Sequence, residues 1–469
     1  MGTILLNSRS LEPNDAIRRI SRQRFDALAG YSRKPSTHVF AEELGWLEHY
    51  CGRVLGVLIR DRTDDDFGGI VMGLDEGHRF RCVEVTGFPL DPNQALPMLI
   101  ERMDDWSRKS DAEFVQGGRQ PAPLDFFTPV VPPNKLSEAF VRLSTTEGFS
   151  PTRGLIEALM NYYEDIDGNF VQQFQSDGFD SRFWELYLFA LLTEEGFVFD
   201  RSYSAPDFLC EGLGQNIFVE AVTVNPTRVG GLLVEPAPPQ TEDEIRSYFR
   251  QYMPIKWGSA LVSKLQKKYW TLPHVQGKPI VLAIQDFHAR RSMTYTNSTL
   301  SPYLYGVEPI SYLEPDGTLR VKLNQIQEHR WGTKTIESGF FLLSGADMIS
   351  AVVQNPTATL SEFNRIDQVA GFGSKKVKMM KFGVCYNPDP NAALPLKYKQ
   401  VVSDPSFTER WCEGLNVYHN PTARYPLEPH LFPKAMHHRL RGDQLFNTIV
   451  EFHPYSAETL ILSPDRRHN

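Results

Sequence analysis

Apolar and polar positions along the first quarter of the chain follow patterns typical of both helices and strands. Residues 40–50 (FAEELGWLEHY) and 93–106 carry apolar side chains at the three- and four-residue spacing of a helix. Between them, three short apolar runs separated by turn residues predict strands at 54–62, 68–75 and 80–88. We therefore expect a small N-terminal α+β accessory domain over residues 1–118. A stretch rich in proline and glycine follows, which favours a linker over residues 119–136.

After this linker the pattern is that of a larger helix-and-strand unit. Residues 181–196 (SRFWELYLFALLTEEG) predict a buried helix that ends at Gly196. A second helix is predicted at 259–270, and strands are predicted at 197–200, 206–210, 216–224 and 279–287. Short apolar runs in the last third of the chain predict further strands at 340–345, 349–354, 381–386 and 414–420.

This order of elements predicts an α/β fold of the mixed α+β kind, with a central mixed sheet flanked by helices. We expect residues 137–300 to form its core. Residues 301–469 are expected to be a C-terminal extension of that α/β core.

Composition changes this picture in two respects. The formal net charge is -8, whereas a protein that relies on non-specific DNA contacts is usually basic, so a nucleic-acid site must be a local basic patch. The five cysteines are scattered and form no CxxC pair, which argues against a disulfide framework and against a structural zinc site.

The expected cellular location follows by exclusion of the alternatives. The longest apolar run, residues 186–192, is far shorter than the ~20 residues of a membrane helix. The N-terminus lacks the pattern of a secretory signal. We expect a cytoplasmic protein without a membrane partner.

Three acidic residues of the middle region stand in unusual surroundings. Glu185 lies within the apolar run FWELYLFALL, where an unpaired carboxylate would be costly to bury. Asp207 follows Pro206, and Glu220 lies in the strand-like run IFVEAVTV. The spacing between Asp207 and Glu220 is that of a hairpin, so two adjacent strands could bring both carboxylates together. Paired carboxylates bind hard cations such as magnesium. Alternatively, Glu185 meets solvent or an arginine, and Asp207 is a turn residue.

These residues resemble a known superfamily. A glutamate on a leading helix, then Pro-Asp, then an apolar strand that carries an acid is similar to the core of PD-(D/E)xK nucleases. The resemblance covers roughly residues 180–290 and implies a restriction-endonuclease-like fold. It also implies metal-dependent hydrolysis of DNA, with Mg or Mn held by Asp207 and Glu220 and with Glu185 as the acid of the leading helix.

One departure from the family pattern concerns the catalytic lysine. The lysine is missing two positions after Glu220, where this chain has Val222. On a helical wheel, Lys256, Lys264 and Lys267 form one stripe beside the apolar face. We expect Lys264, and after it Lys256, to supply the missing positive charge, although a solvated basic face would show the same stripe. In the same segment, Gln266 and Tyr269 resemble the Gln/Tyr element of RecB-like nucleases, with a spacing one residue short.

The expected partner is a nucleic acid. DNA follows from the resemblance, and the residues do not separate DNA from RNA. Candidate phosphate contacts are the lysines of two basic segments, namely Lys267, Lys268, Lys375, Lys376 and Lys378. The oligomeric state stays open, with a homodimer among the possibilities. Two other interpretations also stay open: a catalytically inactive nuclease-like module that binds nucleic acid or protein, and a different hydrolase with paired carboxylates, such as a glycosidase.

Overall fold

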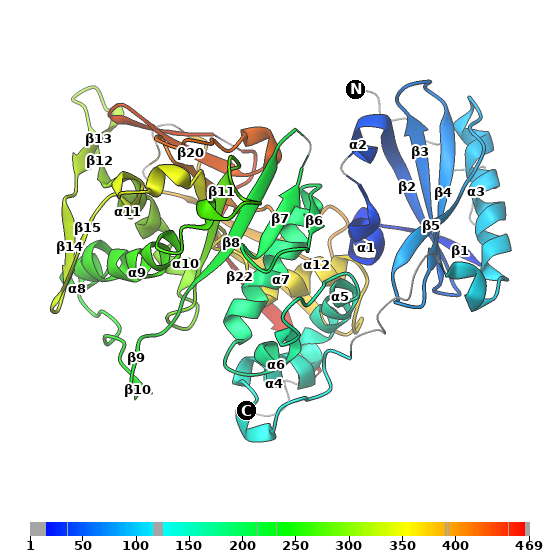
Figure 1. The fold of residues 1–469 in the computed structure, drawn as a ribbon, viewed down its shortest axis with the longest axis horizontal. Coiled ribbons are helices and arrows are strands. Elements are labelled where there is room, and N and C mark those ends of the chain that lie inside the picture. Colours follow the sequence, from blue (N-terminus) through cyan, green and yellow to red (C-terminus); the bar gives the residue numbers. More distant parts are fainter. Residues whose placement is uncertain are drawn as a thin grey trace.

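The computed structural model describes residues 16–464, apart from residues 35, 116–124, 213, 231, 390–391, 393 and 449. It confirms a mixed α/β protein, with one antiparallel N-terminal sheet and one eight-stranded mixed sheet (Figure 1). Part of the expected linker, residues 119–124, lies outside the described residues.

The N-terminal unit is a five-stranded antiparallel sheet in the order β1-β2-β3-β4-β5. Helix α3 packs on one face and α1 on the other, so both faces are apolar. Their bounds are β1 (Ile17–Ile20), α1 (Arg22–Ala29), α2 (Thr37–Phe40), β2 (Ala41–His49), β3 (Val54–Asp61), β4 (Phe67–Leu74), β5 (Phe80–Val85) and α3 (Pro92–Ser107).

The helix predicted at residues 40–50 was wrong, because most of that segment forms strand β2. Leu44 and Leu47 pack toward α3, whereas Ala41 and Trp46 pack toward α1. A bulge between Glu43 and Gly45 shifts the register with β3. A strand that is covered on both faces loses the simple alternation of apolar and polar residues, and here its pattern imitates a helix.

The eight-stranded sheet forms the centre of the molecule, in the order β21-β20-β19-β16-β11-β8-β7-β6. Strands β8, β11 and β16 run parallel, whereas β6, β7 and β8 form an antiparallel meander. Four of the eight strands come from beyond residue 300. Their bounds are β6 (Val198–Asp200), β7 (Phe208–Glu211), β8 (Asn216–Val224), β11 (Ile280–Asp286), β16 (Ala351–Gln354), β19 (Asn416–His419), β20 (Met436–Arg441) and β21 (Gln444–Asn447).

Helices cover both faces of this sheet (Figure 1). One face packs against α4 (Glu138–Thr145), α5 (Ser150–Met160), α6 (Phe170–Gln175), α7 (Phe179–Glu194) and α12 (Leu360–Val369). The other face packs against α9 (Met253–Leu265) and α11 (Leu300–Tyr305).

Strand β8 shows why particular side chains reach each layer. Successive residues of a strand point to opposite faces. Ile217 and Val219 pack into the layer of α7, whereas Phe218 and Val222 pack into the layer of α9. Glu220 shares the face of Phe218 and Val222, and the strand therefore directs its carboxylate toward α9.

Helix α7 confirms the predicted buried helix. Most of its side chains are buried, and it ends where Gly196 adopts a positive φ of 86°. The amides of Gly196 and Phe197 donate to the carbonyls of Thr193 and Leu192, at 3.0 Å each. A left-handed glycine at this position satisfies carbonyls that the helix leaves without partners.

Smaller elements surround the central sheet. The run predicted as a strand at 340–345 was wrong, since residues Phe340–Leu342 form a 3₁₀ turn. The remaining helices are α8 (Glu242–Ser247) and α10 (Met293–Thr296). The remaining strands are β9 (Arg228–Val229), β10 (Leu232–Leu233), β12 (Val307–Leu313), β13 (Leu319–Gln325), β14 (Glu328–Trp331), β15 (Lys334–Glu337), β17 (Lys378–Cys385), β18 (Leu396–Val401) and β22 (Pro454–Leu462).

The N-terminal unit contacts the central unit through α1 (Figure 1). Arg24 donates to the carbonyl of Ala370 at 3.1 Å, and the Tyr162 hydroxyl donates to the carbonyl of Leu28 at 2.8 Å. Among the described helices, none combines the length and the apolar character that crossing a bilayer requires.

Candidate active site

The predicted hairpin is formed by β7 and β8. Its antiparallel register pairs Phe208 with Val219, so Asp207, one residue earlier, falls opposite Glu220. The Asp207 amide donates to Glu220 Oε2 at 3.3 Å, and the Ala221 amide donates to Asp207 Oδ2 at 2.7 Å. These backbone contacts hold the two acids next to each other at the end of β7.

The second carboxylate oxygen of Glu220, Oε1, accepts hydrogen bonds from two residues that lie more than forty positions later in the sequence. Lys264 Nζ and the Tyr269 hydroxyl each donate to Glu220 Oε1 at 2.5 Å. Glu220 is almost fully buried, whereas the Lys264 side chain keeps 24% of its surface exposed. Lys264 therefore forms an ion pair with the carboxylate and still borders open space, rather than belonging to a fully solvated face.

Glu185 approaches the pair from α7 but is held by other partners. Arg182 donates to Glu185 Oε2 at 2.7 Å, and the Tyr163 hydroxyl donates to the same oxygen at 3.3 Å. Burial raises the pKa of Glu185, and the nearby Arg182 guanidinium opposes that rise. The alternative that Glu185 meets an arginine therefore describes its surroundings, although its side chain also lines the same pocket as Asp207.

The pocket in question has a volume of about 960 Å³. Its floor is formed by β8 residues from Ala221 to Val224, and Lys264 borders one side. Trp331 and Lys334, from the β14–β15 hairpin, form another wall. Three carboxylates, from Glu185, Asp207 and Glu235, therefore border the pocket together with three lysines and two aromatic rings. The buried Glu220 is not among the residues that line it.

Lys256 lines this pocket but does not contact Glu220 in the structure. Its Nζ donates to Glu235 Oε1 at 2.8 Å, to the Asn225 carbonyl at 2.8 Å and to Thr227 Oγ1 at 2.9 Å. Of the two lysines expected to replace the missing one, only Lys264 lies against the acidic pair.

The other predicted lysines lie elsewhere. Helix α9 ends at Leu265, so Lys267 is in the following turn and not on the helical stripe. All five candidate phosphate contacts are exposed and none lines the pocket, namely Lys267, Lys268, Lys375, Lys376 and Lys378.

The carboxyl group of Asp207 has a strongly raised pKa. Burial, followed by the negative charges of Glu220 and Glu185, raises the pKa of Asp207 to about 8, and the positive charge of Lys264 opposes that rise. Such a carboxyl retains a proton at neutral pH unless a cation takes the proton's place.

The donor set fits a hard divalent cation held by few protein ligands. Asp207 Oδ2 accepts from a backbone amide, and no described residue donates to its second oxygen, Oδ1. Magnesium is commonly bound through one or two carboxylates and completes its shell with water and substrate phosphates. Among the described residues, Asp207, Glu220 and Glu185 do not bring three ligand atoms within 4.8 Å of one another. A cation here would therefore be held by Asp207 and Glu220, with Glu185 at a greater distance.

Sequence patterns missed three contributors to this site. Arg182 and Tyr163 hold Glu185, and neither belongs to a motif with fixed spacing. Trp331 belongs to the β14–β15 hairpin, more than one hundred residues after Glu220 in the sequence. Of the Gln/Tyr element, Tyr269 contacts Glu220, whereas Gln266 is exposed and lines another pocket.

Comparison with protein-family models, curated protein sequences and solved structures finds no match to this chain.

Proposed function

We propose that this protein is a metal-dependent nuclease with a restriction-endonuclease-like core, which uses Mg or Mn to hydrolyse DNA phosphodiester bonds. The observation that carries the proposal is the contact set around Glu220. Asp207, directly before the adjacent strand β7, donates its amide to Glu220, and Lys264 donates to Glu220 as well. Asp207 and Lys264 both border the same pocket. This set resembles the acid, acid and lysine of the PD-(D/E)xK motif, with the lysine moved to α9.

A bound divalent cation would neutralise phosphate charge and lower the pKa of a bound water. Asp207 and Glu220 would hold that cation. Lys264 would place a positive charge beside the developing negative charge, where the family lysine is missing. Arg182 keeps Glu185 at the pocket wall, where its carboxylate adds to the negative field that attracts a cation.

The pocket supports a nucleic acid as substrate. Trp331 supplies an aromatic ring on which a base could stack, and Lys334 adds a positive charge on the same wall. DNA, rather than RNA, follows from the resemblance. A setting in restriction, repair or defence is an analogy with the same superfamily.

The proposal is tested by cleavage of plasmid DNA with magnesium. We expect Asp207→Asn and Glu220→Gln to lower the rate by at least roughly 100-fold. Glu211→Gln is the matched control, because Glu211 lies exposed at the other end of β7, and it should cleave like the parent. Equal cleavage by the parent and both site variants, or cleavage that persists in excess chelator, would contradict the proposal.

A second candidate function is a catalytically inactive nuclease-like module that binds nucleic acid or a partner protein. Two observations favour it: Val222 occupies the family lysine position, and both Glu220 oxygens already accept hydrogen bonds from protein donors. This candidate predicts binding without cleavage, unaffected by chelator. A glycosidase would be supported by a carboxylate pair with no lysine nearby and by an aromatic-lined groove. Tyr252 and Trp331 do line the pocket, but the Lys264 contact with Glu220 disfavours this alternative.

A further inference from the structure

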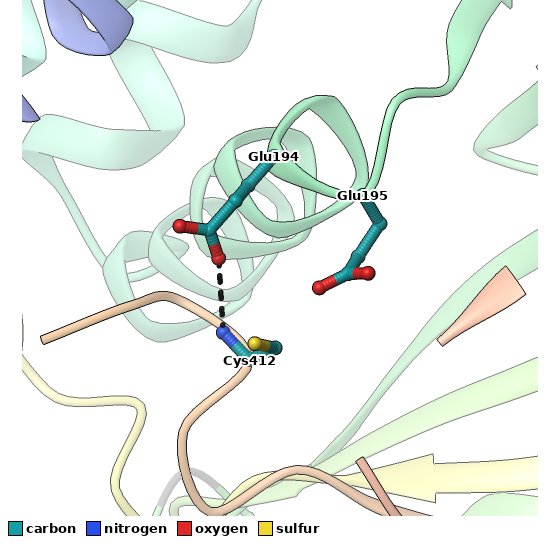
Figure 2. A group of neighbouring side chains, drawn as sticks. All are labelled: Glu194, Glu195 and Cys412. Carbon is teal, nitrogen blue, oxygen red and sulfur yellow. Dashed lines mark hydrogen bonds between the residues drawn. The ribbon is translucent and has the colours of Figure 1, made fainter. Parts of the chain in front are cut away.

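A second cluster of possible metal ligands lies at the far end of α7, where Glu194 ends the helix and Glu195 follows it. Cys412 approaches from the loop that precedes β19. One carboxylate oxygen from each glutamate and the Cys412 sulfur all lie within 4.8 Å of one another. Figure 2 shows both glutamate side chains pointing toward Cys412 from the end of the helix.

The cluster contains a buried carboxylate that is only partly satisfied. The Glu195 side chain is only 2% exposed, and the Cys412 thiol interacts with its carboxylate. Among the described residues, none donates a hydrogen bond to Glu195 Oε1. The Arg410 Nη2 atom is 4.0 Å from this oxygen, at the outer limit of an ion pair. Buried carboxylate oxygens normally accept a hydrogen bond, and a bound cation would explain why Glu195 Oε1 does not.

The neighbouring groups hold the other carboxylate in place. The Cys412 amide donates to Glu194 Oε2 at 3.3 Å, and Arg410 Nε lies 3.4 Å from Glu194 Oε1. Such contacts orient a metal ligand from outside its coordination shell. Burial and the two nearby glutamates raise the pKa of the Cys412 thiol, so a bound cation must displace the thiol proton into solvent. The two carboxylates and the resulting thiolate would carry three negative charges, which Arg410 and a divalent cation would balance.

We propose that Glu194, Glu195 and Cys412 bind a transition-metal cation of the zinc class. A thiolate sulfur selects such a cation over magnesium or calcium, which prefer oxygen ligands alone. Three protein ligands leave one tetrahedral position for water. The site differs in chemistry and in place from the carboxylate pair at Asp207, and it does not depend on the proposed nuclease activity.

A cation at this site would connect the end of α7 to the loop before β19. The same helix carries Arg182 and Glu185 in its first half. The loop is already attached to α7 nearby, since the Tyr187 hydroxyl donates to the Trp411 carbonyl at 2.6 Å. A cation held by both segments would therefore fix the far end of the helix that lines the pocket.

The test is a cobalt titration of the full-length, chelator-treated protein, in a parent whose exposed Cys51 and Cys82 are replaced by serine. Cobalt bound to a thiolate gives a charge-transfer absorption that cobalt bound to carboxylates alone does not give. We expect one equivalent of cobalt to produce this band and zinc to displace it. Zinc should also raise the melting temperature of the parent.

Three variants separate the possible outcomes. Cys412→Ser should abolish the band, and Glu195→Gln should weaken cobalt binding at least 10-fold. Cys385→Ala, which removes a buried thiol from another sheet, should retain the band. The proposal is overturned if the parent gives no band, or if the band persists in Cys412→Ser. Should Cys412→Ser fail to fold, unchanged affinity in Glu195→Gln overturns it. None of these results bears on cleavage at Asp207.

Discussion

Lys264 of α9 donates a hydrogen bond to Glu220 of β8, with Nζ and Oε1 2.5 Å apart. A residue two positions further along β8 on the same face, Val222, occupies the place where the PD-(D/E)xK pattern has its lysine. In the proposed nuclease, α9, which packs on this face, supplies the amine that β8 lacks.

The first prediction concerns Lys264. Lys264→Met removes the positive charge beside Glu220, and we expect the rate of DNA cleavage to fall roughly 100-fold or more. Lys397→Met is the matched control, because Lys397 is exposed on β18 and lines no part of the pocket. Initial rates of plasmid nicking measure the effect. A loss of similar size in both variants would indicate that Lys264 acts only through general charge.

The second prediction tests whether the lysine can return to the strand. Val222 lines the floor of the pocket, so a lysine there could reach the same space. In the Lys264→Met background, we expect Val222→Lys to raise the rate of DNA cleavage at least 10-fold. Val222→Met in the same background should leave the rate unchanged. Because position 222 is buried, with Val222 only 1% exposed, the double variant should also be less stable than the parent. Rates are compared at equal folded fraction, as judged by circular dichroism. Absence of rescue in a folded double variant would argue against equivalent roles for the two positions.

The third prediction concerns stability and pH. Burial and the charges of Glu220 and Glu185 raise the folded-state pKa of Asp207 to about 8, whereas in the unfolded chain an aspartate has an ordinary pKa of about 4. Between these values the folded protein binds more protons than the unfolded chain, so its stability falls as pH rises. Asp207→Asn has no such proton to lose. In chelator, urea unfolding measures the free energy of unfolding of both proteins. Between about pH 4 and pH 8, Asp207→Asn should gain on the order of 5 kcal/mol relative to the parent.

Magnesium supplies the control for this measurement. A cation that replaces the proton on Asp207 should stabilise the parent at pH 8 and leave Asp207→Asn unchanged. If the stability difference between parent and variant does not vary with pH, the Asp207 carboxyl is not perturbed as described.

The fourth prediction concerns Trp331. A base stacked on an aromatic ring contributes about 1–3 kcal/mol, so Trp331→Ala should weaken binding of a single-stranded oligonucleotide roughly 5- to 100-fold. Trp331→Phe should retain most of the affinity. Tyr312→Ala is the comparison, since Tyr312 is an exposed ring on a different hairpin. Fluorescence anisotropy in the Asp207→Asn background measures binding without cleavage. If Trp331→Ala and its parent bind the oligonucleotide with equal affinity, the Trp331 ring does not contact the substrate.

Local patterns predicted the elements that place the acids. The spacing between Asp207 and Glu220 predicted a hairpin, and the register of β7 and β8 confirms it. The apolar run around Glu185 predicted a buried helix, and α7 confirms it. Both features depend on residues close in sequence, where periodicity and turn signals are informative.

Features that depend on distant packing could not be predicted in the same way. Strand β2 has apolar residues on both faces because α1 and α3 cover it, and its sequence alone imitated a helix. The contact of Tyr269 with Glu220 depends on where the chain turns after α9. Glu195 and Cys412 lie more than two hundred residues apart, and the spacing of the cysteines gives no indication that they meet.

The most direct test of the central claim is the location of a bound hard cation. Crystals soaked in manganese should show an anomalous scattering peak between the carboxylates of Asp207 and Glu220, and crystals of Asp207→Asn should lack it. If the parent crystals show no peak there while manganese occupies other carboxylates, the pair does not bind the cation, and the proposed nuclease chemistry is contradicted.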